Sequence, residues 1–411
     1  MQTDFDCLIV GGGMVGASLA CALRDQVLDN KPIKIAVVEA FSPNKNNPPN
    51  YDDRGLGIAP ASQRILQGLG LWEKLEAEAT PIKKIHISDR GHFAATRLSA
   101  EKMGVDQLGH IVIGRALGEV LHDTLNHSEN IEYICPATVA NIEHQSDHIS
   151  VEIQNQKGTN KVTARLLIAA DGGNSQVRKM LDVETEAKQY DQTAIVTNVT
   201  PEISHNNTAF ERFTSTGPLA LLPSSDQRCV VVWTTKTEQA DSIMQLEESE
   251  FLEQLEKRFG HRLGKFLKMG QRRSYPINLI KAKQLIGPRF AILGNAAHTI
   301  HPNAAQGLNL GLRDIAQMAE LIVEAARSNK DIGHPELLNA YAESRQKDHQ
   351  QVIHFSDGLT KIFYNDNPVL ITLRNLAMLG VEHFPPAKRA LTRRAMGLSG
   401  EPPRLVRGLP L

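Results

Sequence analysis

The hydrophobic and polar positions of the first forty residues follow two kinds of pattern. A short apolar run at 7–10 leads into a glycine-rich turn, and residues 14–28 then place apolar side chains at helical spacing. A second apolar run at 33–40 carries Glu39 near its end. This order predicts a β-α-β unit whose glycines form the turn between the first strand and the helix.

The same mixture of apolar runs and helical spacing continues beyond a loop rich in proline and asparagine at 42–53. It predicts helices over 62–79, 114–126 and 307–328, strands around 131–153 and 165–173, and a strand that begins near residue 289.

Short alternating runs of β type occupy two separate segments, 82–98 and 182–284. We expect these segments to form one sheet made by two excursions of the chain. The pattern therefore predicts a discontinuous domain from 1–80, 99–181 and 285–335, a sheet domain from 81–98 and 182–284, and a helical C-terminal region from 336–411.

Composition and charge narrow the class of protein. Of the 411 residues, 41% are hydrophobic and 22% are charged, which is typical of folded globular chains. The 45 basic residues nearly balance the 46 acidic ones, and the net charge is -1. Such a chain has no overall field to attract nucleic acid, so we expect no nucleic-acid partner.

The cysteines and the N-terminus indicate a reducing compartment. The 4 cysteines include no Cys-x-x-Cys pair, and Cys7 and Cys21 lie inside apolar runs, as free thiols do. Asp4 and Asp6 stand where a signal peptide needs positive charge. We therefore expect a cytoplasmic protein without a membrane-spanning segment.

The C-terminal segment 384–411 is locally basic, with six basic residues against Glu401 as its one acid. Interspersed apolar residues make a peripheral contact with the inner face of a membrane one interpretation. A solvated tail and a surface for partner proteins are the alternatives.

The first motif is the G-x-G-x-x-G pattern of Gly11, Gly13 and Gly16. The first glycine permits the tight turn, the second lets the backbone approach a pyrophosphate, and the third allows helix and strand to pack closely. Glu39 follows the glycines at the sequence separation typical of an acid that binds a ribose hydroxyl. These features predict dinucleotide binding, and the alternative is a glycine turn followed by an unrelated acid.

Two further motifs identify the dinucleotide. Together with the first motif, LLIAADGGNSQVR (166–178) and AILGNAAHTIHPNAAQGLNLGLRD (291–314) resemble the three fingerprints of FAD-dependent aromatic hydroxylases of the para-hydroxybenzoate hydroxylase type. The resemblance implies an α/β fold with a Rossmann-like FAD-binding domain, an inserted mixed β-sheet substrate domain and a helical C-terminal region. FAD is the expected cofactor.

The resemblance also implies which residues contact FAD. It places Gly294 and Asn295 at the ribityl chain, although the family has aspartate at the second position, so a negative charge is lost here. The other residues implied are Arg54 and Arg115 over the flavin and pyrophosphate, Asp171 near the pyrophosphate, and Gly307, Leu308 and Asn309 at the pyrimidine edge.

Other chemistries are not favoured by the sequence. His298 and His301 have a spacing seen among metal ligands, but a third ligand is lacking, so we expect no metal. The sequence has no G-x-S-x-G elbow after a strand, so a hydrolase is not indicated. Since no second G-x-G-x-x-G follows a strand, we expect NADPH or NADH to bind transiently as the electron donor.

The segment AFERFTSTGPLALLP (209–223) resembles that of the ubiquinone-biosynthesis hydroxylases and implies a substrate pocket with Gly217, Pro218, Leu219 and Pro302. The substrate implied is a polyprenylated phenol, hydroxylated with molecular oxygen through a flavin hydroperoxide. HISDRGH (86–92) and Asn295 most resemble the group acting on a 2-polyprenyl-6-methoxyphenol, para to the phenol oxygen.

Three alternatives remain open at this point. The enzyme could hydroxylate another ring position in the same pathway, reduce prenyl double bonds with FAD, or be a flavin-binding assembly protein without turnover. No side chain is identified from the sequence as a proton acceptor, and the catalytic residues are left unassigned.

Overall fold

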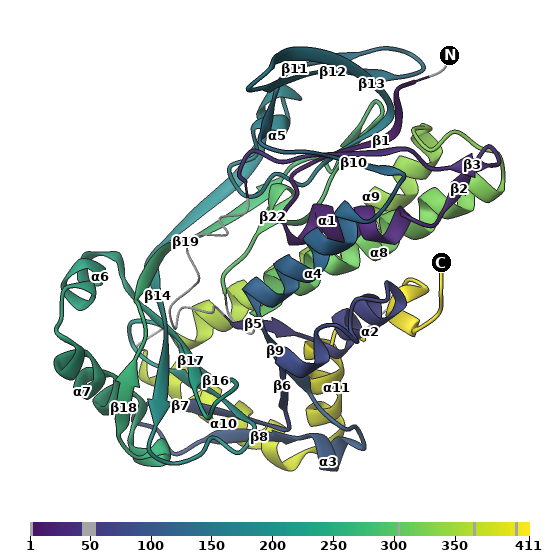
Figure 1. Cartoon of the computed structure of the whole chain (residues 1–411). Helices are drawn as coiled ribbons and strands as arrows, with labels where there is room; N and C mark the ends of the chain where they lie inside the picture. The colour runs from purple at the N-terminus through teal and green to yellow at the C-terminus, as the bar shows by residue number, and fades with distance from the viewer. Residues whose placement is uncertain (1–2, 43–54, 303–304, 365–366, 399–401) are drawn as a thin grey trace.

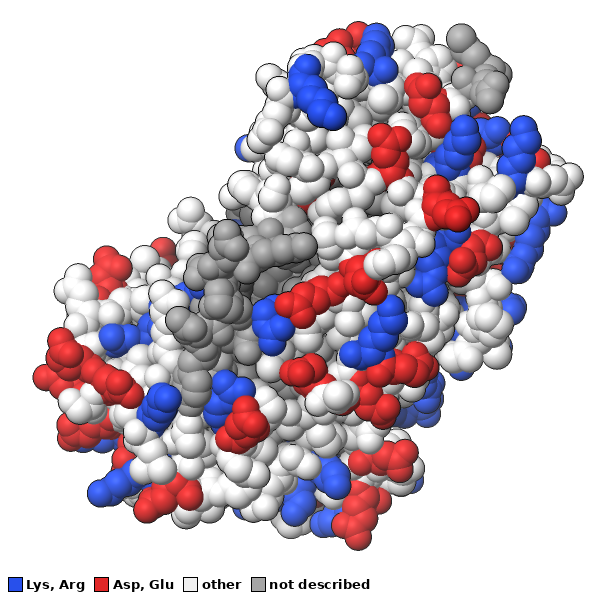
Figure 2. All heavy atoms as spheres, viewed as in Figure 1, with Lys and Arg blue, Asp and Glu red and all other residues white. Residues whose placement is uncertain are grey.

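The structure is a computed structural model that describes residues 3–42, 55–302, 305–364, 367–398 and 402–411. Figure 1 shows two lobes, one around strands β1 and β13 and the other around strands β14 and β17. Basic and acidic side chains are interspersed on the face of the molecule shown in Figure 2.

The first lobe contains a sheet with a parallel centre. Its strand order is β10 (Ile131–Ile134), β4 (Ile35–Val38), β1 (Phe5–Val10), β13 (Gly158–Ala169), β12 (Ile149–Asn155) and β11 (Ala137–His144), and β21 (Phe290–Ile292) pairs with both β13 and β20 (Ile286–Gly287). Strands β10, β4, β1, β13 and β21 run parallel. All residues of β4 are buried, as expected for a strand covered on both faces.

The predicted β-α-β unit is present. Helix α1 (Met14–Leu23) follows β1, but it is shorter than the predicted 14–28. The chain forms a small hairpin of β2 (Val27–Leu28) and β3 (Lys31–Pro32) instead. Asp29 and Asn30 both have positive φ, the conformation that a two-residue hairpin turn requires.

The second lobe is built on a nine-stranded sheet. The order is β22 (His298–Thr299), β19 (Arg273–Ala282), β14 (Thr185–Pro201), β17 (Cys229–Lys236), β16 (Leu219–Pro223), β15 (Thr208–Phe213), β7 (Lys84–Asp89) and β8 (Ala95–Ser99), with β18 (Phe266–Met269) beside β14. Strand β7 pairs in parallel with β15. The two predicted excursions therefore share one sheet, while the exact domain boundaries stay predictions.

The two faces of this sheet pack against different elements. On one face, Leu219, Val231 and Trp233 contact α7 (Glu248–Phe259), next to α6 (Thr237–Met244). On the other face, Val230 lies in a cluster with Ile111. Ile111 belongs to a three-stranded sheet of β5 (Gly55–Ile58), β9 (Gly109–Ile113) and β6 (Ala79–Ile82) between the lobes.

The helices largely follow the sequence pattern. Helix α4 (Gly114–Asn126) has the predicted bounds, and α8 (Gln306–Arg327) begins one residue early. The C-terminal region is helical, with α9 (Pro335–Phe363), α10 (Pro368–His383) and α11 (Pro385–Ala395), each beginning at a proline. Short helices α3 (Ala100–Met103) and α5 (Gln176–Met180) complete the described set.

The predicted helix over 62–79 is wrong in its second half. Helix α2 (Pro60–Gly68) ends early, and a 3-10 turn at Glu76–Glu78 then leads into β6. The chain turns at Gly70, where φ is +66°. Leu71 and Leu75 are nevertheless fully buried. These two buried leucines therefore lie in a turn and not in the predicted helix.

Candidate active site

Four of the predicted cofactor residues lie at one edge of the parallel sheet. Gly11 follows β1, Glu39 follows β4, Asp171 lies just beyond β13, and Gly294 lies just beyond β21. These strands are neighbours in the order β4, β1, β13 and β21, so their carboxyl ends meet. In open α/β sheets, this edge is where ligands bind.

Glycine is needed at the three positions of the first motif for different structural reasons. A Cβ on Gly11, where φ is +107°, would lie 2.4 Å from the Ala170 carbonyl oxygen, and one on Gly16 would lie 2.0 Å from the Gly11 oxygen. A Cβ on Gly13 would meet no described atom within 4 Å. Gly11 and Gly16 are therefore explained by packing, whereas Gly13 adjoins open space.

This space lies at the N-terminus of α1. Gly13 is the N-cap of the helix, and no side chain caps the first amide groups. Free amide groups and the positive end of the helix dipole make such a position suitable for a phosphate group. The first motif therefore fits the diphosphate of a dinucleotide.

Glu39 is oriented by backbone amides. Its Oε2 accepts a hydrogen bond from the Gly12 N–H at 2.7 Å, and its Oε1 accepts one from the Phe41 N–H at 2.8 Å. Each carboxylate oxygen keeps a further acceptor position. The residue can therefore still accept hydrogen bonds from a ribose.

Asp171 is turned toward its own loop. The Ser175 hydroxyl donates to Asp171 Oδ1, and the Val177 N–H donates to Oδ2 at 3.1 Å. Buried Arg178 then donates to the Ala296 carbonyl at 2.7 Å and to the Gly173 carbonyl at 3.0 Å. The side chain of Asp171 thus shapes the second motif, and Arg178 ties that motif to the third.

The third motif packs directly on the first. A Cβ on Gly294, where φ is +58°, would lie 3.0 Å from a Val15 methyl group, and one on Gly311 would lie 2.7 Å from the same methyl. Asn295 is exposed beside Gly294, with its backbone oxygen accepting from the Thr299 hydroxyl at 3.3 Å. The Asn295 side chain therefore remains available for a ligand.

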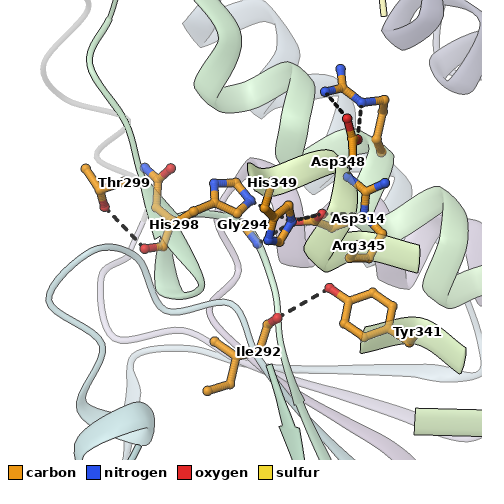
Figure 3. A network of polar contacts seen from close by, with 11 residues as sticks. Ile292, Gly294, His298, Thr299, Asp314, Tyr341, Arg345, Asp348 and His349 are labelled. Carbon is orange, nitrogen blue, oxygen red and sulfur yellow. Dashed lines mark hydrogen bonds and ion pairs between the residues drawn. The ribbon is translucent and has the colours of Figure 1, made fainter. Parts of the chain in front are cut away.

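A buried polar network lies beside this loop and holds it (Figure 3). Asp314 is fully buried and accepts from the Gly294 N–H at 3.1 Å and from Arg345 Nε at 2.8 Å. His298 Nε2 and His349 Nε2 contact its carboxylate at 2.8 and 2.7 Å. Arg345 also pairs with Asp348 at 2.6 Å.

Burial and the neighbouring charges together determine the protonation states of this network. Burial by itself would raise the pKa of Asp314, but His349, Arg345 and His298 lower it well below its usual range. Burial lowers the pKa of His349 to about 4, although Asp314 opposes this shift. At neutral pH, the network holds a charged carboxylate against a neutral His349. Sequence reasoning missed this role of Asp314, which lies inside the quoted third motif.

The two histidines considered as metal ligands have different partners. His298 contacts Asp314, whereas His301 Nε2 lies 3.3 Å from Gln192 Oε1. The ligand atoms of His298, Asp314 and His349 do lie within 4.8 Å of one another. However, the Arg345 cation donates to the carboxylate oxygen that His349 contacts, and so opposes a metal cation there. We describe the group as a hydrogen-bond network.

At the start of α8, the side chain of Asn309 is bound to the backbone of neighbouring elements. Its Nδ2 donates to the Gly57 and Ala305 carbonyls at 2.7 Å each, and its Oδ1 accepts from the Ala59 N–H at 2.8 Å. The buried side chain joins α8 to β5, and the contact of the Asn309 backbone N–H with the flavin stays a prediction. Gly307 and Leu308 are partly exposed, and the helix has no side-chain N-cap.

The two predicted arginines differ in what the structure describes. Arg115 lies in the first turn of α4 and donates to Glu119 at 3.0 Å. Strand β9 leads into α4, and Ile113 pairs with Gly55, so Arg115 lies near the start of β5. Arg54 lies outside the described residues.

On the substrate sheet, Gly217 and Pro218 form a tight turn over β17. A Cβ on Gly217, where φ is +143°, would lie 2.5 Å from Thr234 Cγ2, and the Pro218 carbonyl accepts from the Thr234 N–H at 2.9 Å. Gln192 Nε2 donates to the Thr216 carbonyl at 3.2 Å. Because Gln192 also contacts His301, the Gly217 loop is linked to the loop that holds Pro302.

The position of Leu219 differs from the prediction. Its side chain is fully buried in the cluster against α7, on the face of the sheet turned away from β5 and β9. Since side chains alternate along a strand, Ala220 and Leu222 face the other side. The prediction that Leu219 lines the pocket is therefore wrong for its side chain.

Comparisons with known proteins agree with this geometry. The profile of the FAD binding domain family matches residues 4–356. The chain is 37% identical to the ubiquinone hydroxylase UbiL of Rhodospirillum rubrum, over 99% of this chain and 93% of that protein. It is 29% identical to the 3-demethoxyubiquinol 3-hydroxylase of Escherichia coli, over 95% of this chain and 98% of that protein.

A solved structure shows the same fold. The p-nitrophenol 4-monooxygenase PnpA from Pseudomonas putida DLL-E4 superimposes with a TM-score of 0.80 at 18% identity, covering 98% of this chain and 100% of that one. Together with the family match, this similarity confirms the expected fold class and the expected family resemblance.

Proposed function

Because this chain belongs to the FAD binding domain family, we propose that it is an FAD-dependent monooxygenase that hydroxylates the aromatic ring of a polyprenylated phenol in ubiquinone biosynthesis. NADPH or NADH is the electron donor, and molecular oxygen is the second substrate. Similarity to UbiL along nearly the whole chain supports the substrate class. The observation that carries the proposal is the convergence of three motifs around the open space at Gly13.

Different residues around that edge would bind different parts of the cofactor. The amide groups after Gly13 would hold the diphosphate, Glu39 the ribose, and Asn295 the ribityl chain. The first amide groups of α8, at Gly307 and Leu308, would face the pyrimidine edge of the flavin, where a helix N-terminus favours negative charge. When bound, FAD supplies the redox chemistry that activates oxygen with electrons from the nicotinamide nucleotide.

The substrate side is expected to be dry and apolar. Ala220 and Leu222 of β16 face the side of the sheet that carries Val230. The Gly217–Pro218 turn and Pro302 border this region and are linked through Gln192. Such surroundings exclude water from the reacting ring, which protects the oxygen-transferring species from side reactions.

Oxygen transfer can be tested directly. We expect the FAD-loaded protein, with a prenylated phenol, NAD(P)H and 18O2, to give a product with one labelled oxygen on the ring. A product with a saturated prenyl double bond and no label would indicate the prenyl reductase. A flavin that NAD(P)H fails to reduce with every phenol tested would indicate the assembly protein.

The ring position para to the phenol oxygen is the finer part of the proposal, and it rests on the resemblance of residues 86–92. In the fold, His86 pairs in register with Phe210, whose ring packs against Phe259 of α7. His86 therefore lies on the face turned away from β5 and β9. Mass spectrometry of lipid extracts from cells lacking the protein tests the position, because the accumulated quinone precursor names the missing step.

We also expect a peripheral contact with an anionic membrane, centred on α10. This helix and its C-cap leave five large apolar side chains exposed: Val369 66%, Leu370 41%, Leu373 55%, Leu376 56% and Phe384 59%. Helix α11 follows directly and carries Lys388, Arg389, Arg393 and Arg394 without an acidic residue. Among the described residues, no helix has both the length and the apolar character that crossing a bilayer requires.

Charge complementarity supports a lipid surface as the partner of α10. Apolar side chains beside arginines are the pattern of helices that lie in an anionic bilayer interface. We expect Leu373→Asp with Leu376→Asp to abolish sedimentation with phosphatidylglycerol vesicles. The matched control is Val27→Asp, an exposed valine on the other lobe. Unchanged sedimentation of the double variant would contradict the membrane contact.

A further inference from the structure

Glu211 lies in the middle of β15, on the face of the sheet turned away from α7. The ring of Phe210 packs on Phe259 of α7, with centroids 5.4 Å apart. Since successive side chains alternate along a strand, Ala209, Glu211 and Phe213 point to the other face. This is the face that we assign to the substrate.

The surroundings of the Glu211 carboxylate are apolar. Ala209 belongs to one buried cluster with Val230, and Phe213 belongs to another with Phe363. The residues paired with Glu211 on the neighbouring strands are Ile87 and Ala220. The carboxylate therefore lies between two apolar clusters.

Within the described part of the chain, this carboxylate has neither a hydrogen-bond partner nor an ion-pair partner. Burial raises the pKa of Glu211 to about 7. By surface exposure Glu211 is half-buried. A carboxylate in apolar surroundings without donors is costly, and such groups are found where a ligand or a reaction needs them.

Glu211 is also close to the loop assigned to the cofactor. The ring of Phe363 stacks on Phe213 with centroids 3.6 Å apart, and the next residue is Tyr364. Burial raises the pKa of Tyr364, and so does the negative charge of Glu211, while Gln192 also lies close to its hydroxyl. Gln192 contacts His301, which directly precedes Pro302. The charge of Glu211 therefore acts on Tyr364, and Gln192 connects this region with the third motif.

We infer that Glu211 is a catalytic residue: its carboxylate accepts the proton of the substrate's phenol. This inference rests on the proposed function. The phenol O–H bond breaks, an O–H bond forms on Glu211, and the electron pair stays on the phenolate oxygen. That oxygen then raises the electron density at the ortho and para carbons, which receive the new oxygen atom.

The overall reaction balances without a further reagent. Phenol, oxygen, NAD(P)H and one proton give the dihydroxy product, NAD(P)+ and water. The hydroxylated ring carbon releases its hydrogen as a proton, and the proton held by Glu211 is returned to the phenolate or to solvent. A ligand hydroxyl at this point also provides the donor that the carboxylate lacks in the protein.

The primary test is Glu211→Gln, which keeps the shape of the side chain but cannot accept the proton. We expect kcat/KM for a short-chain prenylated phenol to fall about 100-fold or more. FAD content should be unchanged. The matched control is Glu238→Gln on α6, which makes the same change at a highly exposed site and should retain wild-type turnover.

Two readouts separate a base from a structural residue. The wild-type kcat/KM should rise with pH through about 7, and Glu211→Gln should lack this limb. The neighbours Ile87 and Ala220 carry no charge, and Tyr364 stays neutral in this range because its pKa is raised. A fluorinated phenol that is already ionised at the assay pH should narrow the gap between wild type and variant at least about tenfold.

Each result has a defined meaning. Wild-type protein that inserts no labelled oxygen would overturn the proposed function itself. If the wild type hydroxylates while Glu211→Gln stays within about threefold of it, or if the ionised phenol leaves the gap unchanged, only the role of Glu211 is overturned. If Glu211→Gln loses its fold, Glu211→Asp gives the same test, because a shorter carboxylate should retain part of the pH-dependent activity.

Discussion

Two carboxylates at the proposed active site, buried Asp314 and half-buried Glu211, have opposite surroundings. Asp314, which accepts from the Gly294 N–H, receives hydrogen bonds from this backbone amide and from cationic or imidazole side chains. Glu211, on the substrate sheet, has no such partner in the described chain, and burial raises its pKa to about 7. The first carboxylate is fixed and charged, whereas the second can exchange a proton near neutral pH.

This difference indicates how the two sides of the site divide their work. The cofactor side is expected to hold one loop geometry, and the four contacts on the Asp314 carboxylate favour a single arrangement, although His298 Nδ1 has no hydrogen-bond partner among the described residues. The substrate side must change its protonation during turnover, which a paired carboxylate with a very low pKa could not do. We therefore expect the Asp314 network to stabilise the Gly294 loop, and Glu211 to be retained for the substrate that we propose.

The largest expected effect comes from breaking the Asp314 network. Asp314→Asn should lower the free energy of unfolding by about 3–5 kcal/mol, because buried Arg345 would lose one of its two carboxylate partners and keep only Asp348. The variant should also lose bound FAD, since the Gly294 loop loses its anchor. Urea unfolding with absorbance at the flavin band measures both effects.

The matched control for that variant is Asp123→Asn. Asp123 is exposed and pairs with Lys74 at 3.3 Å, so its loss should cost less than about 1 kcal/mol. Equal stability of the two variants would mean that the buried network contributes no more than a surface pair.

Acidification should lower the free energy of unfolding because of His349, which lies on the cofactor side. Burial lowers the pKa of this histidine to about 4, so between pH 6.5 and 4 the unfolded chain binds a proton that the folded chain does not. Stability should therefore fall with pH across this window, by up to about 3 kcal/mol. Urea midpoints at pH 5 and 7 should differ less in His349→Gln than in wild type or in the exposed control His127→Gln.

The glycines of the first motif should separate fold from cofactor binding. Gly16→Ala places a methyl group 2.0 Å from a backbone oxygen and should cost about 1–3 kcal/mol. Gly13→Ala meets no described atom within 4 Å and should cost less than about 1 kcal/mol, yet it narrows the diphosphate space. Thermal unfolding and FAD titration of both variants test this; a stable Gly13→Ala with wild-type FAD affinity would contradict the assignment of that space.

Elements whose signal is local were predictable from the sequence. The β-α-β unit and α4 follow from apolar periodicity and from turn residues within a few positions. The helix over 62–79 was mispredicted because Leu71 and Leu75 are buried by tertiary packing and not by helical repetition. Periodicity alone does not distinguish these two causes of an apolar spacing.

Site residues were predictable where the local backbone geometry requires a particular residue type. They were less predictable where the role of a side chain depends on partners far away in the sequence. Gly11 and Gly16 were assigned from spacing, and packing accounts for both. The side chain of Asn309 donates to the carbonyl of Gly57, which is far away in the sequence, so local spacing did not indicate this contact. Glu211 was not recognised, because its isolation exists only after two apolar clusters close around it.

The last expected effect concerns the stability of the substrate side. Glu211 has a folded pKa of about 7, above the usual value of an unfolded glutamate, so the folded chain holds the proton more tightly between about pH 4.5 and 7. Its contribution to stability is present at low pH and is lost as the pH rises through 7. Glu211→Gln should therefore match wild type more closely at pH 5 and exceed it by about 1–2 kcal/mol at pH 8. Urea unfolding of both proteins at the two pH values measures this difference, and Glu238→Gln should show none. A Glu211→Gln protein that is less stable than wild type at pH 8 would mean that the carboxylate has a stabilising partner, and the contrast with Asp314 would then fail.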